Sequence, residues 1–169
     1  MRLTLVGAAN GLTGPPKLRL PGPGGSLAAA IPDALEGGPK VSESENKELI
    51  KKGYEAFATG DIETVMSMFD DDVEWVQPGE SAVSGTFHGK TEVLEYLGRL
   101  AEKSLTVKLI DLVADGDTVV ALTEVSAGGE TGRNADVFTV RNGKTVRALI
   151  HGDTAMMERV YGKKAMTAG

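Results

Sequence analysis

Asp136 is the residue whose type and surroundings most clearly indicate chemistry. It lies in the segment 131–153, TGRNADVFTVRNGKTVRALIHGD, which reads as two strands joined at Asn142-Gly143, a dipeptide that tolerates the positive φ angles of tight hairpins. Successive side chains of a strand point to opposite faces, so Asp136 shares its face with Phe138. A carboxyl group among apolar side chains keeps its proton to higher pH and can exchange it with a ligand. The pattern predicts an apolar cavity in which Asp136 is an acid or a base.

A structural role is the alternative interpretation of Asp136. In that case the carboxylate pairs with Arg133 or another cation at the edge of the cavity. A paired carboxylate stays ionised at neutral pH, whereas an unpaired buried one is pushed towards its neutral form. The two interpretations therefore differ in what lies beside the carboxyl group.

Further residues are placed to contact a ligand. A short strand at 73–77 puts Trp75 and Gln77 on one face. Gln77 could hydrogen-bond a ligand carbonyl or satisfy a buried backbone group, and Trp75 is either a core residue or a stacking surface. His88 is expected in a loop over the mouth of the cavity. Tyr96, on a helix, either lines the cavity or packs against the sheet.

Composition excludes several classes of function. A net charge of -6 argues against nucleic acid, whose phosphates need a basic surface. There is no cysteine and there are two histidines, so we expect no metal centre, and the three acids at 70–72 are expected in a solvated turn. Acid–base chemistry at Asp136 needs no cofactor. No apolar run reaches the roughly 20 residues of a membrane helix, so we expect a cytoplasmic protein without membrane contact.

Three helices are expected to support these strands. Ser42 and Glu45 have the spacing of a capping box, so a first helix should begin there and end at Gly60. Asp61 is placed to cap a second helix, and a third is expected from about Thr91. Apolar residues at intervals of three and four predict one buried stripe on each.

Strands make up most of the remainder. After strand 73–77 and a loop at 81–89, strands are expected at 105–114, 118–126, 134–141 and 146 to about 157. Three helices packed on a strongly curved antiparallel sheet form an α+β architecture that can enclose a blind apolar pocket.

Domain organisation follows from a change in composition near residue 41. Residues 1–41 are rich in proline and glycine, which disfavour regular structure, and we expect a flexible or loosely docked extension. The folded domain is expected at 42–162, followed by a C-terminal tail at 163–169.

Three segments carry a resemblance to a known family: AFATGDIETVMSMFDDDVEWVQPG, GTFHGKTEVLEYL and ADVFTVRNGKTVRALIHGD. With them, the chain resembles the SnoaL-like and ketosteroid-isomerase-like proteins of the nuclear transport factor 2 superfamily. The resemblance implies a cone-shaped α+β barrel of the cystatin-like superfold, usually a homodimer, with an apolar pocket open at one end.

The isomerase mechanism is only partly represented. Ketosteroid isomerases use a tyrosine and a protonated aspartic acid as an oxyanion hole and another aspartate as the base. Here Asp136 matches the protonated acid, but Gly53 stands at the tyrosine position and Gln77 at that of the base, where an amide cannot accept a proton. Tyr54 is one residue later on the helix, rotated by about 100°, so we expect it to contact a ligand without completing the oxyanion hole.

The related cyclases and epoxide hydrolases use an acid on the last strand, at the position of Ile150 here. Ile150 is therefore expected to contact the ligand as an apolar residue. The sequence predicts a pocket for a small, oxygen-bearing hydrophobic molecule of steroid, terpenoid or polyketide type. An isomerase, cyclase or hydrolase that uses Asp136 is one interpretation, and a non-catalytic ligand-binding or dimeric interaction module is the alternative.

Overall fold

The computed structural model describes residues 42–165 of the 169-residue chain. The predicted extension at 1–41 and the last four residues of the tail lie outside the described residues. The helices of the described part are α1 (Glu43–Thr59), α2 (Ile62–Ser67), α3 (Gly89–Ala101) and α4 (Thr154–Tyr161). Its strands are β1 (Phe69–Gln77), β2 (Gly85–His88), β3 (Thr106–Asp115), β4 (Thr118–Ala127), β5 (Glu130–Arg141) and β6 (Lys144–His151).

The predicted helix boundaries at α1 and α2 are confirmed. The Ser42 hydroxyl accepts from the backbone of Glu45, and the Glu45 carboxylate accepts from the backbone of Ser42, which completes the capping box. Gly60 ends α1 with a φ of 74°, a left-handed conformation that glycine adopts without strain. The Asp61 side chain caps α2 through the backbone N–H of Thr64.

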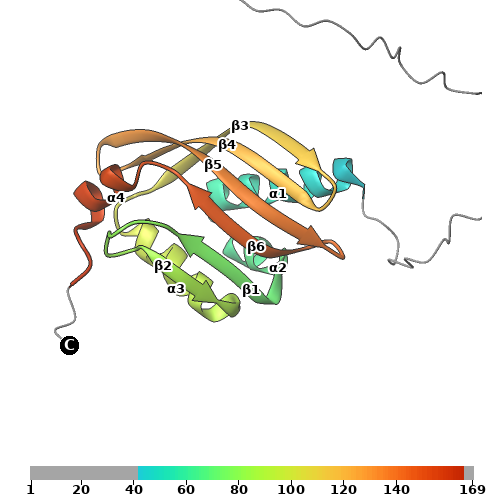
Figure 1. Ribbon diagram of the computed structural model, residues 1–169, viewed down its shortest axis with the longest axis horizontal. Coiled ribbons are helices and arrows are strands. Elements are labelled where there is room, and N and C mark those ends of the chain that lie inside the picture. The colour runs from blue at the N-terminus through green and yellow to red at the C-terminus, as the bar shows by residue number, and fades with distance from the viewer. Residues whose placement is uncertain (1–41, 166–169) are drawn as a thin grey trace, which may run out of the picture. The chain divides into compact units, whose positions relative to one another are not determined.

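The six strands form one curved sheet in the order β2-β1-β6-β5-β4-β3 (Figure 1). β3, β4, β5 and β6 form the predicted antiparallel meander, with Asn142 (φ 50°) and Gly143 (φ 69°) at the β5–β6 turn. One pairing departs from the expected antiparallel sheet, because β1 lies parallel to β6. This pairing places the early strand beside the last one and brings their inward-facing residues together.

Two segments expected to be irregular belong to the sheet. The three acids at 70–72 follow Phe69 within β1, and a shift of register between Phe69 and Glu74 accommodates them with Asp71 and Asp72 exposed. The loop expected at 81–89 contains β2, which pairs with β1 to form an edge hairpin. Four residues are too few to show an alternating pattern, so this strand was missed.

The last strand is shorter than predicted, and a fourth helix follows it. β6 ends at His151, and the Asp153 carboxylate caps α4 by accepting from the backbone N–H of Met156 at 2.9 Å. The expectation of three helices is corrected to four in the part of the chain that the structure describes. The tail begins in contact with the domain, because Lys163 forms a β-bridge with Ser81.

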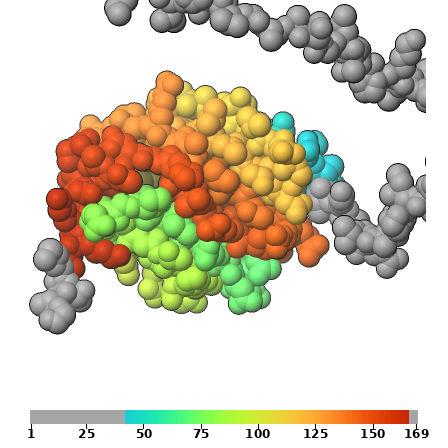
Figure 2. All heavy atoms as spheres, viewed as in Figure 1, coloured from blue at the N-terminus to red at the C-terminus, as the bar shows by residue number. Residues whose placement is uncertain are grey.

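The helices α1, α2 and α3 cover one face of the sheet, and the opposite face is turned to the viewer in Figures 1 and 2. The apolar core lies between the helices and the sheet, in two neighbouring clusters that both contact Trp75. Among residues 42–165, no helix has the length and apolar character needed to cross a bilayer.

Candidate functional site

The inner face of the sheet and the helices enclose an apolar cavity. It has about 120 Å³ of space open to the centres of water molecules, where one ordered water needs roughly 10–15 Å³ by the same measure. The cavity is therefore large enough for a small organic molecule. Aliphatic and aromatic side chains make most of its wall, and the polar or ionisable side chains among its lining residues are Tyr54, Trp75, Gln77, Tyr96, Asn134, Asp136, Thr145 and Asp153.

Asp136 projects from β5 into this cavity and meets Tyr54 of α1. The Tyr54 hydroxyl donates to Asp136 Oδ2 at 2.6 Å, and the Thr123 hydroxyl approaches the same oxygen at 3.4 Å. Asp136 is only 5% exposed, and its other oxygen, Oδ1, is fully buried without a hydrogen bond. One carboxyl oxygen is thus held in place, while the other has no hydrogen-bond partner within residues 42–165.

Tyr54 reaches Asp136 from its later position on the helix. Gly53 leaves the space of a side chain beside it, and the Met68 thioether lies 3.6 Å from where a Cβ of residue 53 would stand. Both Gly53 and Tyr54 line the cavity. A tyrosine is long enough to reach Asp136 from the later position, so the rotation of about 100° along the helix does not prevent the contact.

A second tyrosine pair lies in the same cavity. The Tyr96 hydroxyl of α3 donates to Gln77 Oε1 of β1 at 2.8 Å, and both residues are buried. β1 pairs with β6 up to Val76 and Leu149, and β6 pairs with β5 at Ile150 and Asp136. Continuing this register by one residue sets Gln77 and Asp136 on either side of Ile150.

The cavity shifts the pKa values of both Asp136 and Tyr54 upward. Burial raises the pKa of Asp136, and the polar groups of Tyr54, Asn134 and Thr123 and the nearby His151 oppose the shift without cancelling it. Burial together with the Asp136 charge raises the pKa of Tyr54 well above its usual value. No salt bridge to Asp136 is formed within residues 42–165, since Arg133 is exposed and lies an odd number of residues away on the same strand. The cation pairing of the structural alternative is absent there.

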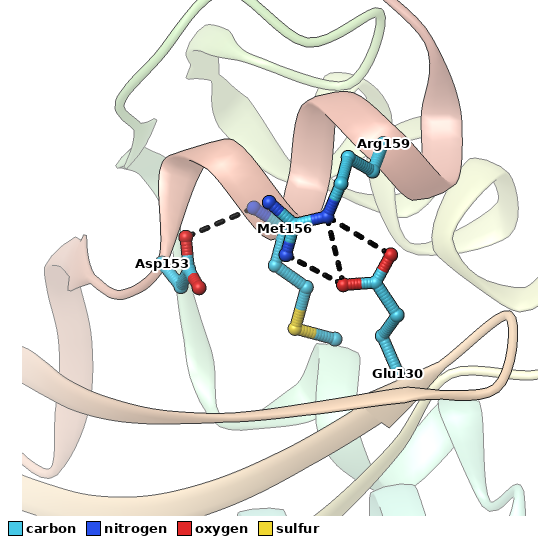
Figure 3. A network of polar contacts seen from close by, with 4 residues as sticks. All are labelled: Glu130, Asp153, Met156 and Arg159. Atoms are coloured by element: carbon cyan, nitrogen blue, oxygen red, sulfur yellow. Dashed lines mark hydrogen bonds and ion pairs between the residues drawn. The ribbon is translucent and has the colours of Figure 1, made fainter.

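Helix α4 closes one end of the cavity. Figure 3 shows Arg159 of α4 paired with Glu130 at the start of β5, with Nη2 and Oε2 2.6 Å apart. This ion pair lowers the pKa of Glu130. Met156 of the same helix lines the cavity together with Asp153. Gly152 lies so close to Asn134 that an added Cβ would stand 2.2 Å from its Oδ1.

The predicted site residues fall into two groups. Lining the cavity are Tyr54, Trp75, Gln77, Tyr96, Asp136, Phe138 and Ile150. His88 does not join them: it is exposed at the end of β2, immediately before α3, and the expectation that it covers the mouth is wrong. Within residues 42–165, no group of three or more His, Asp or Glu side chains is arranged to hold a metal ion.

Sequence reasoning missed several other residues of the site. Thr123 and Asn134 face inward as register partners on β4 and β5, and their even spacing from Ala121 and Asp136 was the available signal. Asp153 and Met156 were assigned to a strand. The spacing of an aspartate cap before a run of helix-forming residues could have revealed α4.

Comparison with known proteins agrees with this architecture. The SnoaL-like domain matches residues 50–148, more than half of the chain. The chain belongs to the SnoaL-like family. An uncharacterized protein of Mycobacterium tuberculosis is 29% identical over 130 residues, which cover 72% of this chain and 99% of that protein.

Solved structures of the same fold include a protein with a cystatin-like fold from Xanthomonas campestris, with 28% identity, a TM-score of 0.65 and coverage of 70% of this chain and 98% of that one. TerC, co-crystallized with polyporic acid, has 27% identity and a TM-score of 0.61, with coverage of 69% of this SnoaL-like chain and 98% of TerC. Other neighbours of this fold are a putative ketosteroid isomerase from Kribbella flavida and a putative polyketide cyclase from Sinorhizobium meliloti.

Proposed function

We propose that this SnoaL-like protein binds a small, mainly apolar molecule that carries an oxygen atom, of steroid, terpenoid or polyketide type. The observation that carries the proposal is the buried, unpartnered Oδ1 of Asp136 in an otherwise apolar cavity. A buried polar atom without a partner lowers stability, and a ligand oxygen would supply the missing hydrogen bond. The co-crystallization of TerC with polyporic acid supports including that compound among the ligands tested.

Asp136 supplies the polar contact as a neutral acid. With Tyr54 donating to Oδ2, the acid proton belongs on Oδ1 and points to the ligand. A neutral carboxyl group in an apolar site donates a strong hydrogen bond to a carbonyl or epoxide oxygen and stabilises negative charge that develops there.

Cofactor-independent acid catalysis is the second candidate function, favoured by this same proton on Asp136. Gln77 cannot act as the base, and the other carboxyl group that lines the cavity, Asp153, is exposed and caps α4. Proton transfer would therefore begin and end on Asp136. The alternative is a non-catalytic binding protein in which Asp136 only orients the ligand.

The experiment that tests the proposal is an NMR titration of the Asp136 carboxyl carbon, assigned by comparison with Asp136→Asn. Steroids, terpenoids, aromatic polyketides and polyporic acid would be added in turn. We expect a pKa above the ordinary range and a carboxyl resonance that moves when a ligand binds. An ordinary pKa together with no binding by any of the compounds would overturn the proposal.

A homodimer is proposed from the outer face of the sheet. The strand register aligns five aliphatic residues across this face: Val76, Leu149, Val137, Val120 and Val113. Val113 is 55% exposed, and Leu122 beside the row is 39% exposed. Beyond Leu122 on the same face, a further row alternates in charge through Lys108, Glu124 and Arg133. A face that combines an apolar stripe with both signs of charge suits a second copy of the same surface.

Light scattering after size-exclusion chromatography tests the dimer. Leu122→Lys places a charge beside the stripe and should shift the protein to monomers. Leu94→Lys is the matched control, because Leu94 is equally apolar and 46% exposed but lies on α3. A monomeric wild-type protein, or equal effects of both substitutions, would contradict this interface.

A further inference from the structure

The indole N–H of Trp75 is a second buried polar group without a partner. Three side-chain polar atoms in residues 42–165 are buried and lack a hydrogen bond: Asn46 Oδ1, Trp75 Nε1 and Asp136 Oδ1. Trp75 and Asp136 line the same cavity, whereas Asn46 lies outside it and binds the backbone of Gly116. A buried tryptophan N–H usually has an acceptor, so its absence here needs an explanation.

The indole ring is fixed by its neighbours. Its centroid lies 5.9 Å from that of Phe69, 5.7 Å from Tyr96 and 6.2 Å from Phe138. Phe69 and Phe138 meet it edge-on, an orientation that aromatic pairs prefer. Rings on several sides leave Trp75 little freedom to turn its N–H towards another acceptor.

The Tyr96 hydroxyl lies beside the indole but does not accept a hydrogen bond from it. The Tyr96 hydroxyl lies close enough for the indole N–H to lower the pKa of Tyr96, although burial raises that pKa overall. That hydroxyl donates to Gln77 Oε1 at 2.8 Å, and Trp75 Nε1 forms no hydrogen bond of acceptable length and angle. The bond to Gln77 uses Oε1 of the amide, and the Nε2 group of the same amide is a donor.

We infer that Trp75 Nε1 is a second polar contact of the cavity and donates a hydrogen bond to an acceptor oxygen of the ligand, at a different point from Asp136. This inference rests on the proposed function, since it concerns the ligand of the same cavity. Trp75 therefore acts through its N–H as well as its ring face, and selects ligands that carry a carbonyl-type or ether-type oxygen there. The donor character of Trp75, the Gln77 amide and neutral Asp136 together favours an acceptor-rich ligand over one rich in hydroxyl groups.

Three compounds of nearly equal shape test the inference: 1,4-diacetylbenzene, 4-ethylacetophenone and 1,4-diethylbenzene, with two, one and no carbonyl groups. Trp75 is the one tryptophan of the chain, so a single indole resonance in a ¹H–¹⁵N spectrum reports on its N–H without any substitution. We expect 1,4-diacetylbenzene to shift this resonance downfield and to bind about tenfold more tightly than 4-ethylacetophenone. 4-Ethylacetophenone should in turn bind more tightly than 1,4-diethylbenzene.

Trp75→Phe keeps an aromatic ring and removes the N–H. In this variant 1,4-diacetylbenzene should lose its tenfold advantage over 4-ethylacetophenone, while 1,4-diethylbenzene binds as it does to the wild type. If the carbonyl compounds move the Asp136 resonance but leave the indole N–H unchanged, the inference is overturned and the proposed function stands. If none of the three compounds binds, the proposed function fails for aromatic carbonyl compounds and the inference fails with it.

Discussion

In each of the two tyrosine pairs of the cavity, a tyrosine hydroxyl donates to a side-chain oxygen on a strand, but only one of the two acceptors is an ionisable group. Tyr54 donates to Asp136 at 2.6 Å and Tyr96 donates to Gln77 at 2.8 Å, with Ile150 of β6 facing the cavity between the two strands. Asp136 can lose a proton and Gln77 cannot. The comparison shows that a buried hydrogen bond from tyrosine positions its partner in both cases, but only the β5 side can make the site respond to pH.

The largest effect on stability is expected when Gln77 is replaced by a carboxylic acid, so that both tyrosines have an acid as their partner. Gln77→Glu would place a second carboxyl group in the cavity, where burial and Asp136 both oppose its ionisation. We expect a loss of about 3 kcal/mol in the free energy of unfolding at pH 8, with a smaller loss at pH 4, where the new acid is neutral in the folded state. Urea denaturation at both pH values measures this.

Gln77→Met is the control for that substitution, because it has a similar length and no ionisable group. Its loss of stability should be the same at pH 4 and pH 8. Equal pH dependence of the Glu and Met variants would mean that the β1 side of the cavity is open to water.

The next effect comes from removing each tyrosine hydroxyl in turn. Tyr96→Phe leaves the Gln77 carbonyl unpaired, at a cost of about 1–2 kcal/mol that does not change with pH. Tyr54→Phe removes the main donor to Asp136, so the pKa of Asp136 should rise further, and the cost of about 1–3 kcal/mol should be greater at pH 8 than at pH 4. Denaturation curves that are pH-independent for both variants would contradict the distinction between the pairs.

Asp136→Asn removes the ionisable group of the Tyr54–Asp136 pair and leaves the Tyr96–Gln77 pair unchanged. The folded protein raises the pKa of Asp136 through burial, so the stabilising contribution is complete below the unfolded pKa of about 3.9 and is lost as pH rises through the folded pKa. Asparagine can still accept from Tyr54 and cannot ionise. The free energy of unfolding of the variant minus that of the wild type should therefore be larger at pH 8 than at pH 4.

Thermal unfolding across this pH range is the measurement. Asp72→Asn, which alters an exposed carboxyl group on β1, should follow the wild-type curve. A constant difference between Asp136→Asn and the wild type would show that Asp136 keeps an ordinary pKa in the fold.

The smallest effect is expected beside Tyr54. Gly53 is helical, and a Cβ there would make only ordinary contacts of 3.6–3.7 Å with the Met68 side chain. Gly53→Ala should stabilise the protein by about 0.5–1 kcal/mol through helix propensity, without moving the Asp136 resonance. A destabilised variant, or a shifted resonance, would show that the Tyr54 side chain depends on the space that glycine leaves.

The local sequence determined much of the fold and the strand faces that carry Asp136, Trp75 and Gln77. Capping by Ser42 and Asp61, the end of α1 at Gly60 and the turn at Asn142-Gly143 depend on interactions within a few residues, so they could be read directly. Alternation along β5 was enough to place Asp136 on the same face as Phe138.

The tertiary structure determined which side chains contact Asp136. Its contact with Tyr54 joins residues 82 positions apart, and the length of the tyrosine side chain lets it reach Asp136 although Tyr54 follows the family's tyrosine position, Gly53, by one residue. The parallel pairing of β1 with β6 brought Gln77 and Trp75 to the same cavity, and α4 closed one end of it. These features depend on long-range packing, because neither strand order nor the free space around a side chain follows from local propensity.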